Sequence, residues 1–326
     1  RHFGVSPSGN FDGRNILHIA RSVAEVAEET GVSAEQAAAT IERAKERLRD
    51  HRRLRIRPGL DDKVVAAWNG LAIRALAEAG AALPNPRYLD AARQGARFAL
   101  TRLVRPDGTL ARTWAKGRPG EVNGFLDDYA ATALGLFALY AATGETEWFA
   151  AGRDLTLRIE TLFADGEGGL FASSSSDLIK RPQDLLDTPS PSGTSLAAEA
   201  CLVLSLYTGD PDLRDRAGGY LRSLGQIIER YPSAAGHALA VLLSLDRGTH
   251  ELAVVGADAR LVGAPYWQRY RPHIVIATSE GQPGVEIPLL ERRGQPGRTL
   301  AYLCTGFTCL APVDSSARLS ELLEST

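Results

Sequence analysis

The stretch that decides the fold is 61–80, DDKVVAAWNGLAIRALAEAG, in which a charged loop leads into an alanine-rich helix. Beyond Trp68 the apolar residues follow the spacing of one helix face. They are Leu71, Ala72, Ala75, Leu76 and Ala79. A polar, aromatic-tipped loop that opens a buried helix is a candidate ligand site. Its candidate contacts are Asp61, Asp62, Lys63, Trp68 and Asn69.

The same pattern returns twice, so that nearly all-apolar helices begin near Trp68, Tyr129 and Ser195, a period of roughly 60 to 66 residues. An amphipathic helix is predicted after each of them, at 86–103, 147–163 and 212–230. Helices that are apolar all round must be enclosed by protein, whereas amphipathic ones face water on one side. This alternation predicts helical hairpins arranged as an inner and an outer ring, an α/α toroid. A further apolar helix is predicted at 234–245.

The two ends of the chain have different patterns. Ser33 and Gln36 form a capping-box pattern that predicts a helix at 33–54 with Ala37, Ile41, Ala44 and Leu48 on its buried stripe. Strands are predicted at 251–256, 273–277 and 299–304, with a helical segment between the first two, as in a βαβ unit. We therefore expect a mainly α protein with toroid hairpins at 1–247 and a small α/β segment at 248–326, packed on the toroid.

Composition excludes several classes of function. The 326 residues are 44% hydrophobic and 23% charged, with a net charge of −2, which is ordinary for a globular protein and offers no basic surface for nucleic acid. No apolar run approaches the roughly 20 residues of a membrane span. Three cysteines do not make a disulfide framework, so we expect a cytoplasmic protein. Nothing in the motifs predicts a cofactor or a metal.

The loops before the inner helices are the predicted site, because parallel inner helices open at the same end. Besides 61–63, they contribute Asp127, Asp128 and Tyr129, and then Ser192, Thr194 and Ser195. Carboxylates, hydroxyls and aromatic faces suit a sugar, and Asp62, Asp127 and Asp128 are candidates for general acid and base. The alternative is helix capping, which the same residue types also favour at these positions.

Four further residues with reactive side chains need an interpretation. Cys304 and Cys309 are a candidate redox pair; buried thiols are the favoured interpretation, with a reversible disulfide or a metal site as alternatives. Cys201 lies within an apolar helix and is predicted to belong to the core. His237 precedes an apolar helix and is interpreted as a structural histidine.

Several motifs together resemble the YyaL-like family of thioredoxin-domain-containing proteins, which includes the spermatogenesis-associated thioredoxin-like proteins of animals. The motifs are GNFDGRNILH, DDK-x5-WNGL, GFLDDYA, PSGTS and AYLC-x4-C-x2-PV, and they run from residue 9 to residue 313. The resemblance implies a six-hairpin (α/α)6 toroid similar to glycosidases and N-acylglucosamine 2-epimerases. Thr194 stands where the family usually has asparagine. No catalytic residue can be transferred from the family.

The resemblance also implies what surrounds this chain. It corresponds to the C-terminal half of such a protein, about half of the ring, so a thioredoxin-like domain and the first hairpins are expected as partners. The function it implies is directed at a small carbohydrate, as a hydrolase, an epimerase or a sugar-binding module. The alternative is a non-catalytic scaffold or a redox-linked module that acts with the thioredoxin-like domain.

Overall fold

A computed structural model describes residues 1–83, 85–175, 177–281 and 287–324, and divides the chain into two compact units. Unit 1 is Arg1–Asp61 and unit 2 is Asp62–Thr326. The sequence predicted a boundary after residue 247, but the contacts separate the chain after Asp61 instead. The α/β segment belongs to unit 2 together with the hairpins, because its sheet shares their hydrophobic core.

Unit 1 contains two helices joined by a short linker, α1 (Val23–Thr30) and α2 (Ala34–Arg53). Both begin with a capping box, and the predicted pair Ser33 and Gln36 forms the second one. Ala37 and Ile41 are buried as expected, whereas Leu48 is 44% exposed. The predicted stripe therefore ends one turn early within this unit.

Unit 2 is built from helical hairpins in two layers. The inner helices are α3 (Ala66–Ala82), α5 (Leu126–Thr143) and α7 (Gly193–Thr208). The outer helices are α4 (Pro86–Phe98), α6 (Thr146–Phe163) and α8 (Pro211–Ser223). α5 packs between α3 and α7, and each outer helix packs on the inner helix that precedes it. The predicted alternation of apolar and amphipathic helices is confirmed, and the protein is mainly α.

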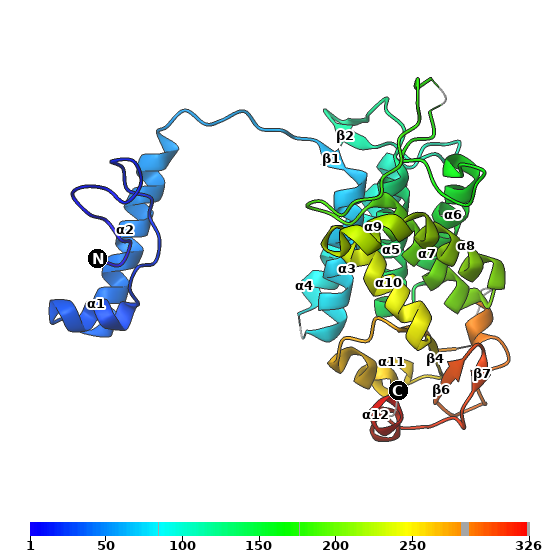
Figure 1. Cartoon of the computed structure of the whole chain (residues 1–326). Helices are drawn as coiled ribbons and strands as arrows, with labels where there is room; N and C mark the ends of the chain where they lie inside the picture. Colours follow the sequence, from blue (N-terminus) through cyan, green and yellow to red (C-terminus); the bar gives the residue numbers. More distant parts are fainter. Residues whose placement is uncertain (84, 176, 282–286, 325–326) are drawn as a thin grey trace. The chain divides into compact units, whose positions relative to one another are not determined.

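Shorter elements complete the helical part of unit 2. α4 continues as a π-helical turn at Ala99–Leu103, and α8 is followed, after Leu224, by α9 (Gly225–Arg230). The fourth apolar helix, α10 (Gly236–Arg247), packs against α7. The short strands β1 (Val64–Val65), β2 (Thr113–Ala115) and β3 (Arg118–Pro119) pair beside the start of α3. Figure 1 shows β1 and β2 at the upper end of the helical layer.

Glycine allows the closest contact between inner helices. A methyl group on Gly70 of α3 would collide with the backbone of α5 at Ala131, and Gly135 of α5 faces the Gly70 carbonyl in turn. Nearer the other end, the rings of Tyr140, Phe149 and Tyr207 meet with centroids 5.4–5.5 Å apart and join α5, α6 and α7. Small residues at one level and large aromatic ones at the next thus set the spacing of the layer.

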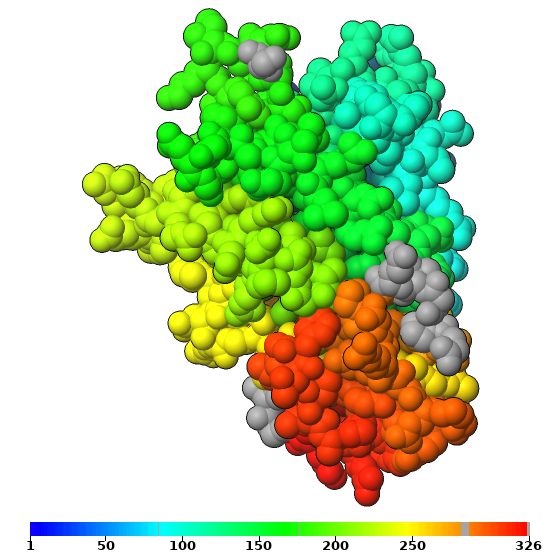
Figure 2. Space-filling model, turned by 90° about the vertical axis from the view of Figure 1, so that its right-hand side faces the viewer, coloured from blue at the N-terminus to red at the C-terminus, as the bar shows by residue number. Residues whose placement is uncertain are grey.

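The C-terminal part of unit 2 is a four-stranded sheet at the opposite end of the inner helices (Figure 1). Its strands are β4 (His250–Val255), β5 (Ile274–Ser279), β6 (Leu300–Thr305) and β7 (Thr308–Cys309), in the order β5-β4-β6-β7. β4 and β5 are parallel, with α11 (Ala259–Gly263) in the crossover, so the predicted βαβ unit is confirmed. Figure 2 shows this segment, in orange and red, as the lower lobe of the unit.

The two faces of the sheet serve different cores. Ala253, Val255, Val275 and Ala277 belong to the core of the helical hairpins. The opposite face packs with α12 (Ser316–Glu324) through Leu319 and Leu323, in a separate cluster. The predicted packing of the α/β segment on the helical layer thus corresponds to one apolar face of a short sheet.

The cysteines differ from the favoured interpretation. β6 and β7 pair antiparallel with Cys304 opposite Cys309, and the two sulfurs form a disulfide. The prediction of two buried free thiols was wrong because the turn at Gly306 and Phe307 brings the cysteines into register. Cys201 is a buried free thiol in α7, as expected, and burial raises its pKa to about 12. Within the described residues, no helix is both long enough and apolar enough to cross a membrane.

Candidate functional site

The predicted loops before α5 and α3 meet at the carboxylate of Asp128, which is fully buried. Its oxygens accept hydrogen bonds from the backbone N–H groups of Ala67 (2.8 Å) and Phe125 (2.9 Å) and from Arg112 Nη1 (2.9 Å). Burial, reinforced by the neighbouring Asp127, raises the pKa of Asp128 to about 6. One side chain therefore caps α5 and also holds the first turn of α3.

Two aspartates bind backbone N–H groups at the starts of α7 and α10. Asp184 accepts a hydrogen bond of 2.6 Å from the N–H of Gly193. Asp187 accepts from the N–H groups of Ser192 (2.9 Å) and His237 (2.8 Å), and so joins the starts of α7 and α10. Burial, together with the neighbouring carboxylates, raises the pKa of Asp184. Carboxylates thus join the start of α5 to that of α3, and the start of α7 to that of α10.

The hydroxyl-bearing candidates face inward. The Tyr129 hydroxyl accepts from the N–H of Leu110 (2.8 Å), and the Ser192 and Ser195 hydroxyls lie 2.9 Å apart. Tyr129, Ser192, Thr194 and Ser195 are at most 1% exposed. The capping alternative fits Ser192, whose hydroxyl accepts from the N–H of Ser195 (3.3 Å) at the start of α7. A ligand contact by these four side chains stays a prediction.

The opening stretch behaves differently from the other two loops. Asp61 closes unit 1, whereas Asp62 and Lys63 begin unit 2 on its exposed surface. Trp68 is 67% exposed on the first turn of α3, and Asn69 donates to the carbonyl of Val65 (2.8 Å). Of the three carboxylates named as candidate acids or bases, Asp62 is exposed, Asp127 is paired with Arg112 at 3.3 Å, and Asp128 is buried.

A cavity of about 430 Å³ lies elsewhere, along the middle and the C-terminal parts of α3, α5 and α7. The connection from α11 to β5 (264–273) and the first two residues of β5 form its remaining wall. Its aromatic lining residues are Phe137, Tyr207, Tyr266, Trp267 and Tyr270. Its charged lining residues are Arg74, Glu78, Glu199, Arg269 and Arg271. The site predicted from the sequence lies at the other end of the inner helices, and no predicted feature indicated this cavity.

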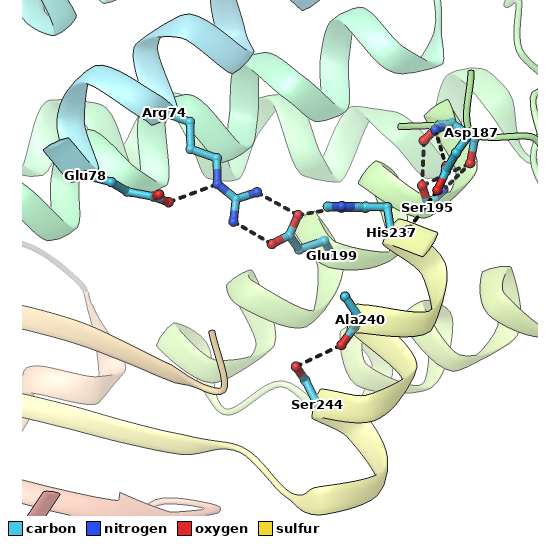
Figure 3. Close-up of polar contacts among 9 residues, drawn as sticks. Arg74, Glu78, Asp187, Ser195, Glu199, His237, Ala240 and Ser244 are labelled. Atoms are coloured by element: carbon cyan, nitrogen blue, oxygen red, sulfur yellow. Dashed lines mark hydrogen bonds and ion pairs between the residues drawn. The ribbon is translucent and has the colours of Figure 1, made fainter. Parts of the chain in front are cut away.

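A half-buried charge network borders the cavity and links α3, α7 and α10 (Figure 3). Arg74 of α3 binds both oxygens of Glu199 of α7 through its two Nη atoms, each at 2.8 Å. Its Nε donates to Glu78 at 3.0 Å, and His237 Nε2 of α10 lies 2.9 Å from Glu199 Oε2. Asp187 holds the backbone N–H of the same histidine. The interpretation of His237 as structural agrees with these contacts.

The network fixes the charge of Glu199. Burial by itself disfavours the carboxylate, but Arg74 and the hydrogen bond from His237 overcome that effect and lower the pKa of Glu199 to about 2. In return, Glu199 and Glu78 outweigh burial and raise the pKa of Arg74. The wall of the cavity thus carries a permanent, rigidly held ion pair. A carboxyl group that is ionised at every ordinary pH does not suit proton donation to a substrate.

The signal for this network is present in the sequence. Glu199 is the one charged residue in the segment GTSLAAEACLVLSLYT, which forms α7, and Arg74 stands among apolar neighbours in α3. A charge inside an otherwise apolar helix must find a partner when the helix is enclosed. The sequence does not show that Arg74 of α3 pairs with Glu199 of α7, because that pairing depends on the three-dimensional arrangement of the helices. Among the described residues, no group of three or more His, Cys, Asp or Glu side chains is arranged to hold a metal.

The known proteins with a similar sequence are much longer than this chain. Spermatogenesis-associated protein 20 of Homo sapiens is 28% identical over 99% of this chain, and the same protein of Mus musculus is also 28% identical. An uncharacterized protein of Caenorhabditis elegans is 26% identical over 97% of the chain. The match covers 45% of each of these proteins, so the chain spans about half the length of the curated relatives it matches. No protein-family model matches the chain.

Among solved structures, the chain is similar to cellobiose 2-epimerase from Bacillus thermoamylovorans, with 17% identity and a TM-score of 0.43 over 50% of this chain and 44% of the other. It is also similar to a GH76 α-mannanase of Bacteroides thetaiotaomicron, with 13% identity and a TM-score of 0.47 over 71% of this chain and 67% of the other. In sequence, the chain is similar to spermatogenesis-associated protein 20 over nearly its whole length.

Proposed function

We propose that unit 2 binds a small carbohydrate in the cavity bordered by Arg74 and Glu199. The observation that carries the proposal is the combination of five aromatic rings with a rigid ion pair in one hollow of about 430 Å³. This volume lies within the range of about 300 to 1,000 Å³ that is usual for small-molecule sites. The resemblance to six-hairpin glycosidases and epimerases is in accord with the proposal but does not carry it.

The lining offers what a sugar ring needs. Tyr270 is 80% exposed and Trp267 is half-buried, so both rings can present a face to the C–H side of a sugar. Arg269 and Arg271 flank Tyr270 and supply donors, and the carboxylate of Glu78 remains 41% exposed and can accept from hydroxyl groups. The lining combines apolar faces with charged hydrogen-bonding groups, which favours an uncharged, hydroxyl-rich ligand.

Binding and positioning fit the site better than hydrolysis. Glycoside hydrolysis uses a carboxylic acid of raised pKa beside a second carboxylate. In the cavity wall, Glu199 has a pKa of about 2, and both of its oxygens are engaged. The carboxyl groups of raised pKa at the inner-helix starts, Asp128 and Asp184, are bound to backbone N–H groups instead.

The same proposal includes partners in a longer protein, namely a thioredoxin-like domain and further helical hairpins. It also includes a cytoplasmic location.

Thermal denaturation with sugars tests the proposal. Glucose, mannose, N-acetylglucosamine and cellobiose are added separately at millimolar concentration, and the melting temperature is recorded. A ligand at 100 times its Kd adds about 2.7 kcal/mol to the stability of the folded state. Tyr270→Ala should abolish the shift caused by a binding sugar, whereas Tyr231→Ala, an exposed tyrosine outside the cavity lining, should leave it unchanged. If no sugar raises the melting temperature, or Tyr270→Ala preserves the shift, the proposal is wrong.

A further inference from the structure

The disulfide at the tip of the C-terminal sheet has two unequal sulfurs. Cys304 lies in β6 and is 1% exposed, whereas Cys309 lies in the short strand β7 and is half-buried. Cys309 also lines a surface hollow of about 510 Å³, together with Pro288, Arg292, Arg293 and Pro312. A second protein's thiol can therefore approach Cys309 from solvent, while the rest of the sheet covers Cys304.

Arg293 lies directly against both sulfur atoms. Its Nη2 is 3.0 Å from Cys309 Sγ and 3.5 Å from Cys304 Sγ. A second hydrogen bond to the Leu289 carbonyl and the Phe307 ring, 5.8 Å from the guanidinium carbon, hold this side chain in place. A fixed positive charge beside a sulfur stabilises the thiolate that forms when a disulfide is cleaved. Sulfur access and a stabilised leaving group thus occur at one place.

The hairpin is held by contacts that do not involve the disulfide. The Phe307 N–H donates to the buried carboxylate of Glu251 in β4 (3.3 Å), and the Phe307 ring packs against Gly209 at the end of α7. β6 pairs with β4 from Leu300 to Cys304. Cleavage of the S–S bond therefore leaves the strand pairing and the turn anchored, which allows the two sulfurs to meet again on oxidation.

We propose that the Cys304–Cys309 disulfide is a reversible thiol–disulfide exchange site, reduced through Cys309 by a dithiol reductant. A thiolate of the reductant attacks Cys309 Sγ, the S–S bond breaks, and Cys304 leaves as a thiolate beside Arg293 and takes a proton from water. The reductant's second thiolate then attacks the reductant sulfur of the mixed disulfide, and Cys309 leaves as a thiolate that takes a proton from water. The reductant loses two electrons and becomes a disulfide, and the protein gains two thiols.

Timed reduction by dithiothreitol tests the site in the folded protein. Free thiols are blocked with iodoacetamide at intervals, and peptides that contain Cys304 and Cys309 are quantified by mass spectrometry. We expect both cysteines to become labelled at the same rate without loss of helical circular dichroism, while Cys201 stays unlabelled. Arg293→Gln should slow the reduction about tenfold, because a charge-assisted contact to the leaving sulfur is lost. Arg292→Gln, in the same hollow but without a described sulfur contact, should react at the wild-type rate.

Single-cysteine variants test which sulfur is attacked. In the Cys304→Ser variant, the remaining Cys309 should react quickly with 5,5′-dithiobis(2-nitrobenzoate). In the Cys309→Ser variant, the remaining Cys304 should react at least tenfold more slowly, because Cys304 is covered. The proposal is overturned if the disulfide is reduced only after denaturation, if the Arg293→Gln and Arg292→Gln rates are equal, or if the two single cysteines react alike. Each of these readouts is independent of sugar binding, so the two proposals can fail separately.

Discussion

Replacing Glu199 with glutamine removes one charge from the network that joins α3, α7 and α10. In the folded protein the pKa of Glu199 is about 2, against an ordinary value of 4.5. At about 1.4 kcal/mol per pH unit, this difference corresponds to roughly 3 kcal/mol of favourable interaction with the ionised carboxylate. Breaking a fully buried ion pair by removing one partner costs about 3 to 5 kcal/mol, and this pair, with side chains 24% and 16% exposed, belongs at the low end of that range. Glu199→Gln should therefore destabilise the protein by about 3 kcal/mol at pH 7.

Urea unfolding followed by circular dichroism measures this loss, with Glu78→Gln as the matched control. Glu78 binds the same arginine but is 41% exposed, so its removal should cost less than about 1 kcal/mol. Because the folded-state pKa of Glu199 is lowered, its contribution is complete above about pH 4.5 and disappears as the pH falls toward 2. The difference between wild type and Glu199→Gln should shrink over that interval. Equal stabilities of Glu199→Gln and Glu78→Gln at pH 7 would refute the reasoning. So would a stability difference between wild type and Glu199→Gln that does not change with pH.

Further predictions concern the inner helices and their starts. Gly70→Ala should cost at least about 2 kcal/mol in urea unfolding because its methyl group meets the backbone of α5, whereas Gly218→Ala in α8, with ordinary contacts only, should stabilise by about 0.5 to 1 kcal/mol. Tyr129→Phe should cost about 1 to 2 kcal/mol by leaving the buried N–H of Leu110 without its acceptor; full stability would show that another group satisfies it. The pKa of Asp128 is raised to about 6, so ionisation opposes folding, and its contribution should make the stability fall as the pH rises from about 4 to 6. Asp128→Asn should flatten that part of the pH profile, and an unchanged profile would contradict the assignment.

Much of the fold could be predicted because its signals are local. Apolar helices at 66–82, 126–143 and 193–208 alternate with amphipathic ones, and the period of the pattern identified the hairpins. The three longer strands of the C-terminal sheet, β4, β5 and β6, were recognisable as short apolar runs between turn residues. The capping box at Ser33 and Gln36 was predicted from spacing alone and is present. Each of these features depends on residues close together in the sequence.

The site could be predicted only in part, because its contacts are long-range. Residues near the start of α5 and α7 were correctly brought to one end, but their carboxylates are occupied by backbone N–H groups of neighbouring helices. The cavity depends on Arg74 meeting Glu199, 125 residues away, and on Tyr270, which lines it from the connection between α11 and β5. No local pattern contains those pairings. The disulfide was an alternative but not the favoured interpretation for a related reason, since only the hairpin register places Cys304 opposite Cys309.

Hydrogen–deuterium exchange with and without a stabilising sugar tests the central claim most directly, because it distinguishes the two ends of the inner helices. If the cavity binds the sugar, amides in the segment 264–272 and in the C-terminal half of α3 should exchange more slowly when the sugar is present. Amides at 189–195 and 125–129, at the starts of α7 and α5, should be unaffected. Protection confined to those starts, with no change at 264–272, would contradict the account and return the site to the helix-opening loops.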